Sequence, residues 1–93
     1  MAAPALRLVI TGRVQGVGFR AWTCREARRR ALRGWVRNRA DGSVEALFIG
    51  EAAALEAMAE ACLRGPPLAE IRAVTRHPAA DDGSTGFGER PTA

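Results

Sequence analysis

The sequence contains no lysine and no tyrosine, only one histidine and only two cysteines among its 93 residues. Because Cys24 and Cys62 lie far apart and match no metal-ligand spacing, the sequence offers no cysteine metal site. We expect both to be buried apolar residues of a reduced, cytoplasmic protein. No stretch approaches the roughly 18 apolar residues of a membrane span, and the N-terminal segment lacks the apolar run of a secretory signal. These absences predict a cytoplasmic protein without a membrane partner.

All fourteen basic residues are arginine, and the formal net charge is +4. Such a charge would suit a nucleic-acid partner. However, an arginine-only, alanine-rich composition is typical of a GC-rich genome, and the Arg28–Arg30 run falls in a helical pattern, where charges are usually solvated. We therefore expect no nucleic-acid partner. The 47% hydrophobic and 26% charged residues are ordinary for a globular protein, and we expect one domain spanning 1–93.

Six stretches show the periodicity of a strand or a helix. They are, in chain order, a strand at 6–11, a helix at 20–32, strands at 35–38 and 44–49, a helix at 51–64 and a strand at 68–76. Asp41–Gly42 is a strong hairpin signal, and a short last strand around Phe87 stays open. This order predicts the split βαβ, or ferredoxin-like, sandwich, an α+β fold in which two helices cover one face of an antiparallel sheet.

The loop GRVQGVGFR at 12–20 joins the first strand to the first helix and invites a phosphate-binding interpretation. Gly16-x-Gly18-x-x-Ala21 matches the dinucleotide fingerprint, and Asp41 stands at about the distance of its ribose-binding acid. That interpretation fails because Asp41 belongs to a hairpin, whereas the fingerprint requires a parallel sheet. A Walker-type loop is excluded because no Gly-Lys-Ser or Gly-Lys-Thr is present.

Cys24 and Arg30 have the C-x5-R spacing of the cysteine phosphatases. With so many arginines, such a match arises readily by chance. The mechanism also needs backbone N–H groups wrapped around the phosphate, whereas the intervening residues are helix formers whose N–H groups are used within the helix. We therefore reject a cysteine nucleophile.

A phosphate cradle is the interpretation that survives. The N–H groups from Gln15 to Arg20 can converge on one point, because glycine lets the backbone turn. The start of the helix adds partial positive charge, and Arg20 can bind two phosphate oxygens with its planar guanidinium. The structural alternative is that Gly16 and Gly18 serve only a tight turn.

GRVQGVGFR, followed by GWVRNRADGSVE and GPPLAEIRAV, closely resembles the signature segments of the acylphosphatase family, and the likeness covers 6–76. The resemblance implies the ferredoxin-like sandwich already expected. It also implies hydrolysis of the carboxyl–phosphate bond of a small acyl phosphate to a carboxylate and inorganic phosphate, by a monomer that needs no metal and no cofactor.

Carried over by position, the resemblance makes Arg20 the substrate-binding arginine and Asn38 the residue that positions the attacking water. The phosphate would also be bound by the backbone of the loop that precedes Arg20. The residues of this loop are Gln15, Gly16, Val17, Gly18 and Phe19. Arg13 matches the first arginine of the motif but is assigned no chemistry. The tail at 86–90 departs from the family, because it is poorer in apolar residues than the usual last strand.

The remaining polar candidates are expected to be structural. His77 would be an exposed residue at a strand end, and Asp81 and Asp82 would be solvated loop residues and not metal ligands. Two other functions stay open: a non-catalytic module that senses an acyl or carbamoyl phosphate or another anion, and a basic nucleic-acid binder of the same fold. An RNA-binding sheet normally carries stacking aromatics, and here Phe19 and Trp22 fall at the loop and helix.

Overall fold

The computed structural model describes residues 2–93, and its elements follow the predicted order. They are β1 (Ala5–Arg13), α1 (Phe19–Arg29), β2 (Arg33–Asn38), β3 (Val44–Ile49), α2 (Ala52–Arg64), β4 (Glu70–Pro78) and β5 (Phe87–Glu89). The first helix ends three residues earlier than predicted, since the chain leaves it through Ala31, whose φ of 57° lies in the left-handed region. The last strand, left open by the sequence, is present and short.

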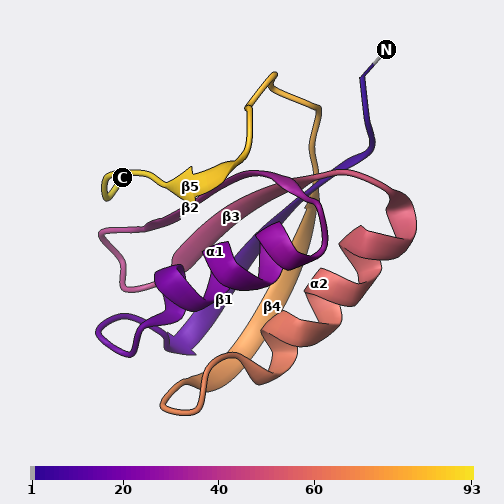
Figure 1. Ribbon diagram of the computed structural model, residues 1–93. Helices are drawn as coiled ribbons and strands as arrows, with labels where there is room; N and C mark the ends of the chain where they lie inside the picture. The colour runs from indigo at the N-terminus through magenta and orange to yellow at the C-terminus, as the bar shows by residue number, and fades with distance from the viewer. Residues whose placement is uncertain (1) are drawn as a thin grey trace.

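The five strands form one sheet in the order β4-β1-β3-β2-β5. The first four strands pair antiparallel, as expected, but β5 pairs parallel to β2, so the sheet is mixed and not wholly antiparallel. The cause is the last connection, which crosses from β4 at one edge of the sheet to β2 at the other (Figure 1). The chain therefore enters β5 in the same direction as β2. The ferredoxin-like α+β fold is otherwise as predicted.

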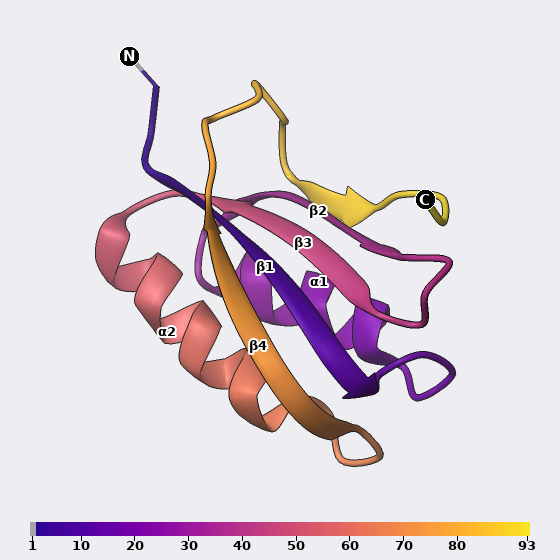
Figure 2. The same cartoon turned by 180° about the vertical axis from the view of Figure 1, so that it is seen from behind.

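Both helices lie on the same face of the sheet, in front of it in Figure 1 and behind it in Figure 2. Alternation along the strands turns large apolar side chains toward them, and these interdigitate with the apolar side of each helix. The core includes Leu8, Ile10, Val36 and Phe48 from the sheet, Cys24 and Ala27 from α1, and Met58 and Cys62 from α2.

The two cysteines are buried core residues, as predicted. Burial raises the pKa of the Cys24 thiol, and it raises that of Cys62 to about 12. Cys24 also lies in the middle of α1, so the residues after it do not form a phosphate-binding loop. The C-x5-R interpretation is therefore excluded by the fold as well.

The opposite face of the sheet carries a second, smaller cluster that the sequence did not reveal. It contains Trp35, Leu47 and Ile49, and Trp35 is only 8% exposed. The guanidinium carbons of Arg37 and Arg90 each lie 4.8 Å from the centre of the indole ring. The indole is therefore covered and offers no open surface on which a nucleobase could stack.

The loop aspartates bind other groups of the chain, and of the two only Asp82 is exposed as expected. Asp81 accepts hydrogen bonds from Arg33 at 2.6 Å and from the backbone N–H of Ala3 at 3.1 Å. Asp82 accepts one from the Trp35 indole at 3.1 Å. These contacts fasten the β4–β5 loop to β2 and to the N-terminal segment. The lone histidine, His77, is half-buried within β4, where it was expected to be exposed.

The arginine run after Cys24 is not a uniformly solvated face either. Arg28 donates from Nε at 3.0 Å and from Nη2 at 2.7 Å to the carbonyl oxygen of Phe87. Arg30 pairs with Glu26 at 2.7 Å, whereas the Arg29 side chain is 71% exposed. Arg28 thus ties β5 to α1. Within residues 2–93, no helix is long and apolar enough to span a membrane.

Candidate active site

The loop between β1 and α1 turns sharply at two glycines. Gly16 and Gly18 have φ values of 73° and 78°, a conformation that residues with a Cβ rarely adopt. Gly18 is also the N-cap of α1, and its carbonyl accepts the Trp22 N–H at 3.0 Å. The sequence therefore needs glycine at both positions to bring the loop onto the start of the helix.

The backbone N–H groups of this loop have no carbonyl partners. In the described part of the chain, none of the N–H groups from Gln15 to Gly18 donates to a backbone carbonyl. Backbone donors normally find an acceptor, so a run without one is suited to an external anion. The N-terminus of α1 adds the partial positive charge of the helix to the same region.

The side chain of Gln15 has a structural task that the sequence did not predict. Its Nε2 donates to the carbonyl oxygens of Arg39 at 2.8 Å and of Ser43 at 2.9 Å. Asp41 closes the hairpin by accepting the Ser43 N–H at 2.9 Å, and hydrogen bonds from Ser43 lower the pKa of its carboxyl. The loop is thus tethered to the β2–β3 hairpin, and Asp41 has a structural partner of its own.

Phe19 fixes the other end of the loop. Its side chain is 2% exposed, and its ring lies 5.3 Å from that of Trp22, measured between centroids. Only the backbone of Phe19 can therefore contribute to binding. The loop is held at one end by the Gln15 amide and at the other by this buried ring.

A hollow of about 160 Å³ lies beside the loop. It brings together five of the predicted site residues, while the predicted Gln15 and Val17 do not line it. Its lining consists of Gly16, Gly18, Phe19, Arg20 and Asn38, together with Val14, Ala21 and Glu89. The arginine and the asparagine, which are far apart in sequence, therefore face one small space.

Asn38 reaches the hollow because of the alternation of β2. Val36 points into the core between sheet and helices, and Asn38 follows on the same side, whereas Arg37 points to the other face. The carbonyl of Asn38 accepts the N–H of Ala93 at 3.0 Å. The end of β2 is thus held from both sides, by β3 and by the C-terminal segment.

Glu89 is the charged lining residue that the sequence did not predict. One of its carboxylate oxygens lies 3.6 Å from Nη1 of Arg20. A signal was present: alternation places Glu89 on the same side as Phe87, which is buried in the core. The Glu89 side chain is 46% exposed, and Arg20 is the arginine that lies beside it.

The acylphosphatase family model matches residues 6–88 of the chain. The chain belongs to the acylphosphatase family. It is 52% identical over 88 residues to an acylphosphatase of Acidiphilium cryptum, covering 95% of this chain and 97% of that protein. It is 51% identical over 83 residues to one of Rhodospirillum rubrum, covering 89% and 91%.

A solved structure shows the same fold. The crystal structure of acylphosphatase from Bacillus subtilis superimposes with a TM-score of 0.90 at 37% identity, over 97% of this chain and 99% of that one. The family and fold predicted from the signature segments are therefore confirmed. As a member of the acylphosphatase family, the protein is a hydrolase that acts on acid anhydrides of phosphate.

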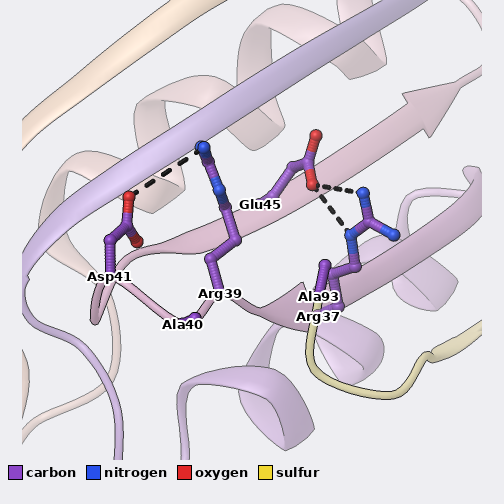
Figure 3. A pocket seen from close by; sticks show the side chains of 6 residues that line it. All are labelled: Arg37, Arg39, Ala40, Asp41, Glu45 and Ala93. Carbon is purple, nitrogen blue, oxygen red and sulfur yellow. Dashed lines mark hydrogen bonds and ion pairs between the residues drawn. The ribbon is translucent and has the colours of Figure 1, made fainter.

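A larger hollow of about 410 Å³ lies on the other side of the hairpin (Figure 3). Arg37 there donates to Glu45 at 2.8 Å, and Arg39 lies 3.9 Å from Asp41. Burial raises the pKa of Glu45, but hydrogen bonds from Arg37 and Arg7 outweigh it and leave the pKa lowered. The Arg37 guanidinium is thus engaged in a hydrogen bond, and no residue of the glycine loop lines the space. The smaller hollow is therefore the better candidate for the active site.

The charged residues give no sign of a metal centre. Over residues 2–93, no group of three or more histidine, cysteine, aspartate or glutamate side chains is arranged to hold a metal ion. What the acylphosphatase fold assembles at the hollow is a guanidinium, an amide, a carboxylate and a set of backbone donors.

Proposed function

We propose that the hollow beside the glycine loop hydrolyses the carboxyl–phosphate bond of acyl phosphates without a metal or cofactor. Arg20 and the N–H groups of residues 15–20 bind the phosphoryl oxygens, and Asn38 positions the attacking water. The observation that carries this proposal is one small space that Arg20 and Asn38 line together with Gly16 and Gly18, two loop glycines whose N–H groups have no carbonyl partner.

The substrate's own chemistry explains why so few groups suffice. The water oxygen attacks phosphorus, the bond from phosphorus to the acyl oxygen breaks, and its electron pair leaves with the carboxylate. A carboxylate is stable at neutral pH, so no general acid must protonate it, and the proton of the attacking water passes to solvent. Phosphoryl transfer proceeds through a loose transition state, in which positioning and hydrogen-bond donors provide most of the catalysis.

Asn38 suits the role of positioning residue for water. An amide is too weak a base to remove a proton from water, but its oxygen accepts a hydrogen bond and so directs the attack. The side chains that would hold the water and the phosphoryl group are on rigid elements, because Asn38 ends β2 and Arg20 lies in the first turn of α1. The attacking water and the phosphoryl group are thereby held in line.

The size of the hollow supports a phosphoryl site with an open acyl side. Its volume of about 160 Å³ is well below the roughly 300–1,000 Å³ of clefts that enclose drug-sized ligands. The phosphoryl group would occupy the hollow while the acyl group extends toward solvent. We therefore expect activity toward acyl phosphates with different acyl groups.

We further propose that one copy of the chain, as a single domain over 1–93, is the working unit in the cytoplasm. The groups that the proposed mechanism uses, which are Arg20, Asn38 and the glycine loop, meet within one copy of the chain, so the mechanism calls on no residue of a second copy. The buried thiols of Cys24 and Cys62 suit a reducing compartment. Elution as a monomer with unchanged specific activity on dilution tests the oligomeric part.

The deciding experiment is hydrolysis of benzoyl phosphate by the purified chain, with and without a chelator. We expect equal amounts of benzoate and inorganic phosphate, at a rate that the chelator leaves unchanged. Activity that disappears on chelation and returns with Mg²⁺ would contradict the metal-free mechanism. Binding of phosphate without any turnover would favour the alternative of a non-catalytic anion sensor.

A further inference from the structure

Glu89 places a negative charge in a site built for an anion. Its carboxylate is the only acidic side chain among the described residues that line the hollow, and it lies 3.6 Å from Arg20. The hydrolysis derived above makes no use of it. A carboxylate beside a phosphoryl group is unfavourable, since like charges at short distance repel each other.

The carboxylate is held near the hollow by its strand. Val36 of β2 is the register partner of Glu89, and the next residue, Arg90, donates its N–H to the Val36 carbonyl at 2.8 Å. On the other side, Arg28 binds the Phe87 carbonyl through two nitrogens. The backbone on both sides of Glu89 is therefore fixed, so its side chain stays near an incoming anion.

The contact between Glu89 and Arg20 is too weak to fix the position of the Arg20 side chain. It joins one nitrogen to one oxygen at 3.6 Å without a hydrogen bond, and the two side chains are 46% and 39% exposed. The hydrogen-bonded ion pairs of the sheet are much closer. Arg33 lies 2.6 Å from Asp81, and Arg37 lies 2.8 Å from Glu45.

Hydrolysis increases the negative charge that the site holds. An acyl phosphate dianion carries two charges, whereas the carboxylate and the hydrogen phosphate formed from it carry three, with one proton released to solvent. A fixed carboxylate therefore opposes retention of both products and weakens the binding of free phosphate.

We propose that Glu89 is an affinity-limiting residue, whose charge lowers the affinity of the site for inorganic phosphate and so favours release of the products. This inference rests on the proposed site at Arg20 and the glycine loop. It assigns to the last strand a role in turnover that the loop and Asn38 do not have.

The test compares the wild type with Glu89→Gln by calorimetric titration with inorganic phosphate. Removing the charge while keeping the shape should tighten phosphate binding about threefold to tenfold, the range typical of one partly exposed charge. The KM for benzoyl phosphate should fall in parallel. The matched control is Glu60→Gln, which makes the same change in net charge at an exposed position of α2 and should leave phosphate affinity unchanged.

Two further measurements keep the outcome clear. Glu89→Ala should tighten binding in the same direction, and the melting temperature of each variant shows that it is folded. In about 1 M salt, where charges are screened within about 3 Å, the gain over wild type should largely disappear. Unchanged or weaker phosphate binding in Glu89→Gln, or a gain that persists in high salt, would overturn the proposal.

Phosphate titration does not depend on turnover, so the two proposals fail separately. If the wild type does not hydrolyse benzoyl phosphate but Glu89→Gln still binds phosphate more tightly, the proposed function is wrong and the role of Glu89 stands. If hydrolysis is normal and phosphate affinity is unaffected, only the role of Glu89 is wrong.

Discussion

The fourteen positions that carry lysine or arginine in this protein are all arginine, and these arginines have different roles in the fold. Arg20 lines the hollow with its side chain 39% exposed, so it can bind a ligand. Arg28, two helical turns later, is bound to the Phe87 carbonyl, and Arg33 pairs with Asp81. The planar guanidinium serves all three because it donates several hydrogen bonds in a fixed geometry. A lysine would keep the charge and lose that geometry.

Replacing Arg20 by lysine separates charge from geometry. We expect a large fall in kcat/KM and weaker binding of both substrate and phosphate, because one ammonium group cannot hold two phosphoryl oxygens together. Steady-state kinetics with phosphate as competitive inhibitor measure both effects. Arg13→Lys is the matched control, since Arg13 lies at the exposed end of β1 and does not line the hollow. Normal phosphate affinity in Arg20→Lys would contradict the role assigned to this arginine.

Replacing Asn38 by alanine should affect turnover and leave binding intact. The loop and Arg20 remain, so phosphate should bind almost as in the wild type. Because the attacking water is no longer positioned, kcat should fall at least about a hundredfold, the scale of losing one positioned catalytic group. Single-turnover kinetics and phosphate inhibition distinguish the two effects. Normal turnover by Asn38→Ala would show that another group directs the water.

At the scale of elements, the site depends on three connections between segments that are distant in sequence. Gln15 ties the glycine loop to the β2–β3 hairpin, Phe19 anchors the start of α1 in the core, and Arg28 ties α1 to β5. Each connection holds one wall of the hollow. Weakening an element far from the reacting atoms should therefore change the site.

Arg28→Met tests the last of these connections. Methionine keeps much of the apolar length of the side chain but removes both hydrogen bonds to the Phe87 carbonyl. We expect the free energy of unfolding to fall by about 1–2 kcal/mol, the cost of losing hydrogen bonds from a charged donor at a partly exposed position. Hydrogen exchange at residues 87–89 should become faster. Arg29→Met, at a largely exposed position of the same helix, is the control and should change neither quantity.

Sequence reasoning succeeded where local pattern decides the structure. The alternation at 6–11, the Asp41–Gly42 hairpin and the glycines before α1 each determine the backbone within a few residues. It failed where a contact depends on which strand lies beside which. The roles of Arg28 and Glu89 follow from parallel pairing of β5 with β2, and a three-residue strand has too weak a pattern to reveal its partner.

At the scale of the whole molecule, Asp81 joins three segments. Its carboxylate binds Arg33 of β2, the N–H of Gly83 in the β4–β5 loop, and the N–H of Ala3 near the N-terminus. The hydrogen bond from Arg33, followed by those from the two backbone N–H groups, lowers the pKa of this carboxyl well below its ordinary value. Folding therefore favours its charged form.

This shift predicts how stability depends on pH. A carboxyl whose pKa is lowered by folding stabilises the protein above its unfolded pKa, about 3.9, and loses that effect as the pH falls through the folded value. Asp81→Asn should therefore lower the melting temperature at pH 7, and the difference from wild type should shrink progressively below pH 4. Thermal melts across this range measure it, with Glu60→Gln as control. A difference that stays constant with pH would show that Asp81 does not stabilise the fold through its charge.

The attachment of β5 affects whether copies of this protein can associate by strand pairing. Strand edges carry unpaired backbone groups on which other chains can assemble. Arg72, Arg76 and Pro78 along β4 oppose such pairing at one edge of the sheet. At the other edge, β5 and residues 90–93 occupy the backbone groups of β2. By holding β5 in place, Arg28 therefore also keeps the backbone of the six-residue β2 from serving as a template for intermolecular aggregation.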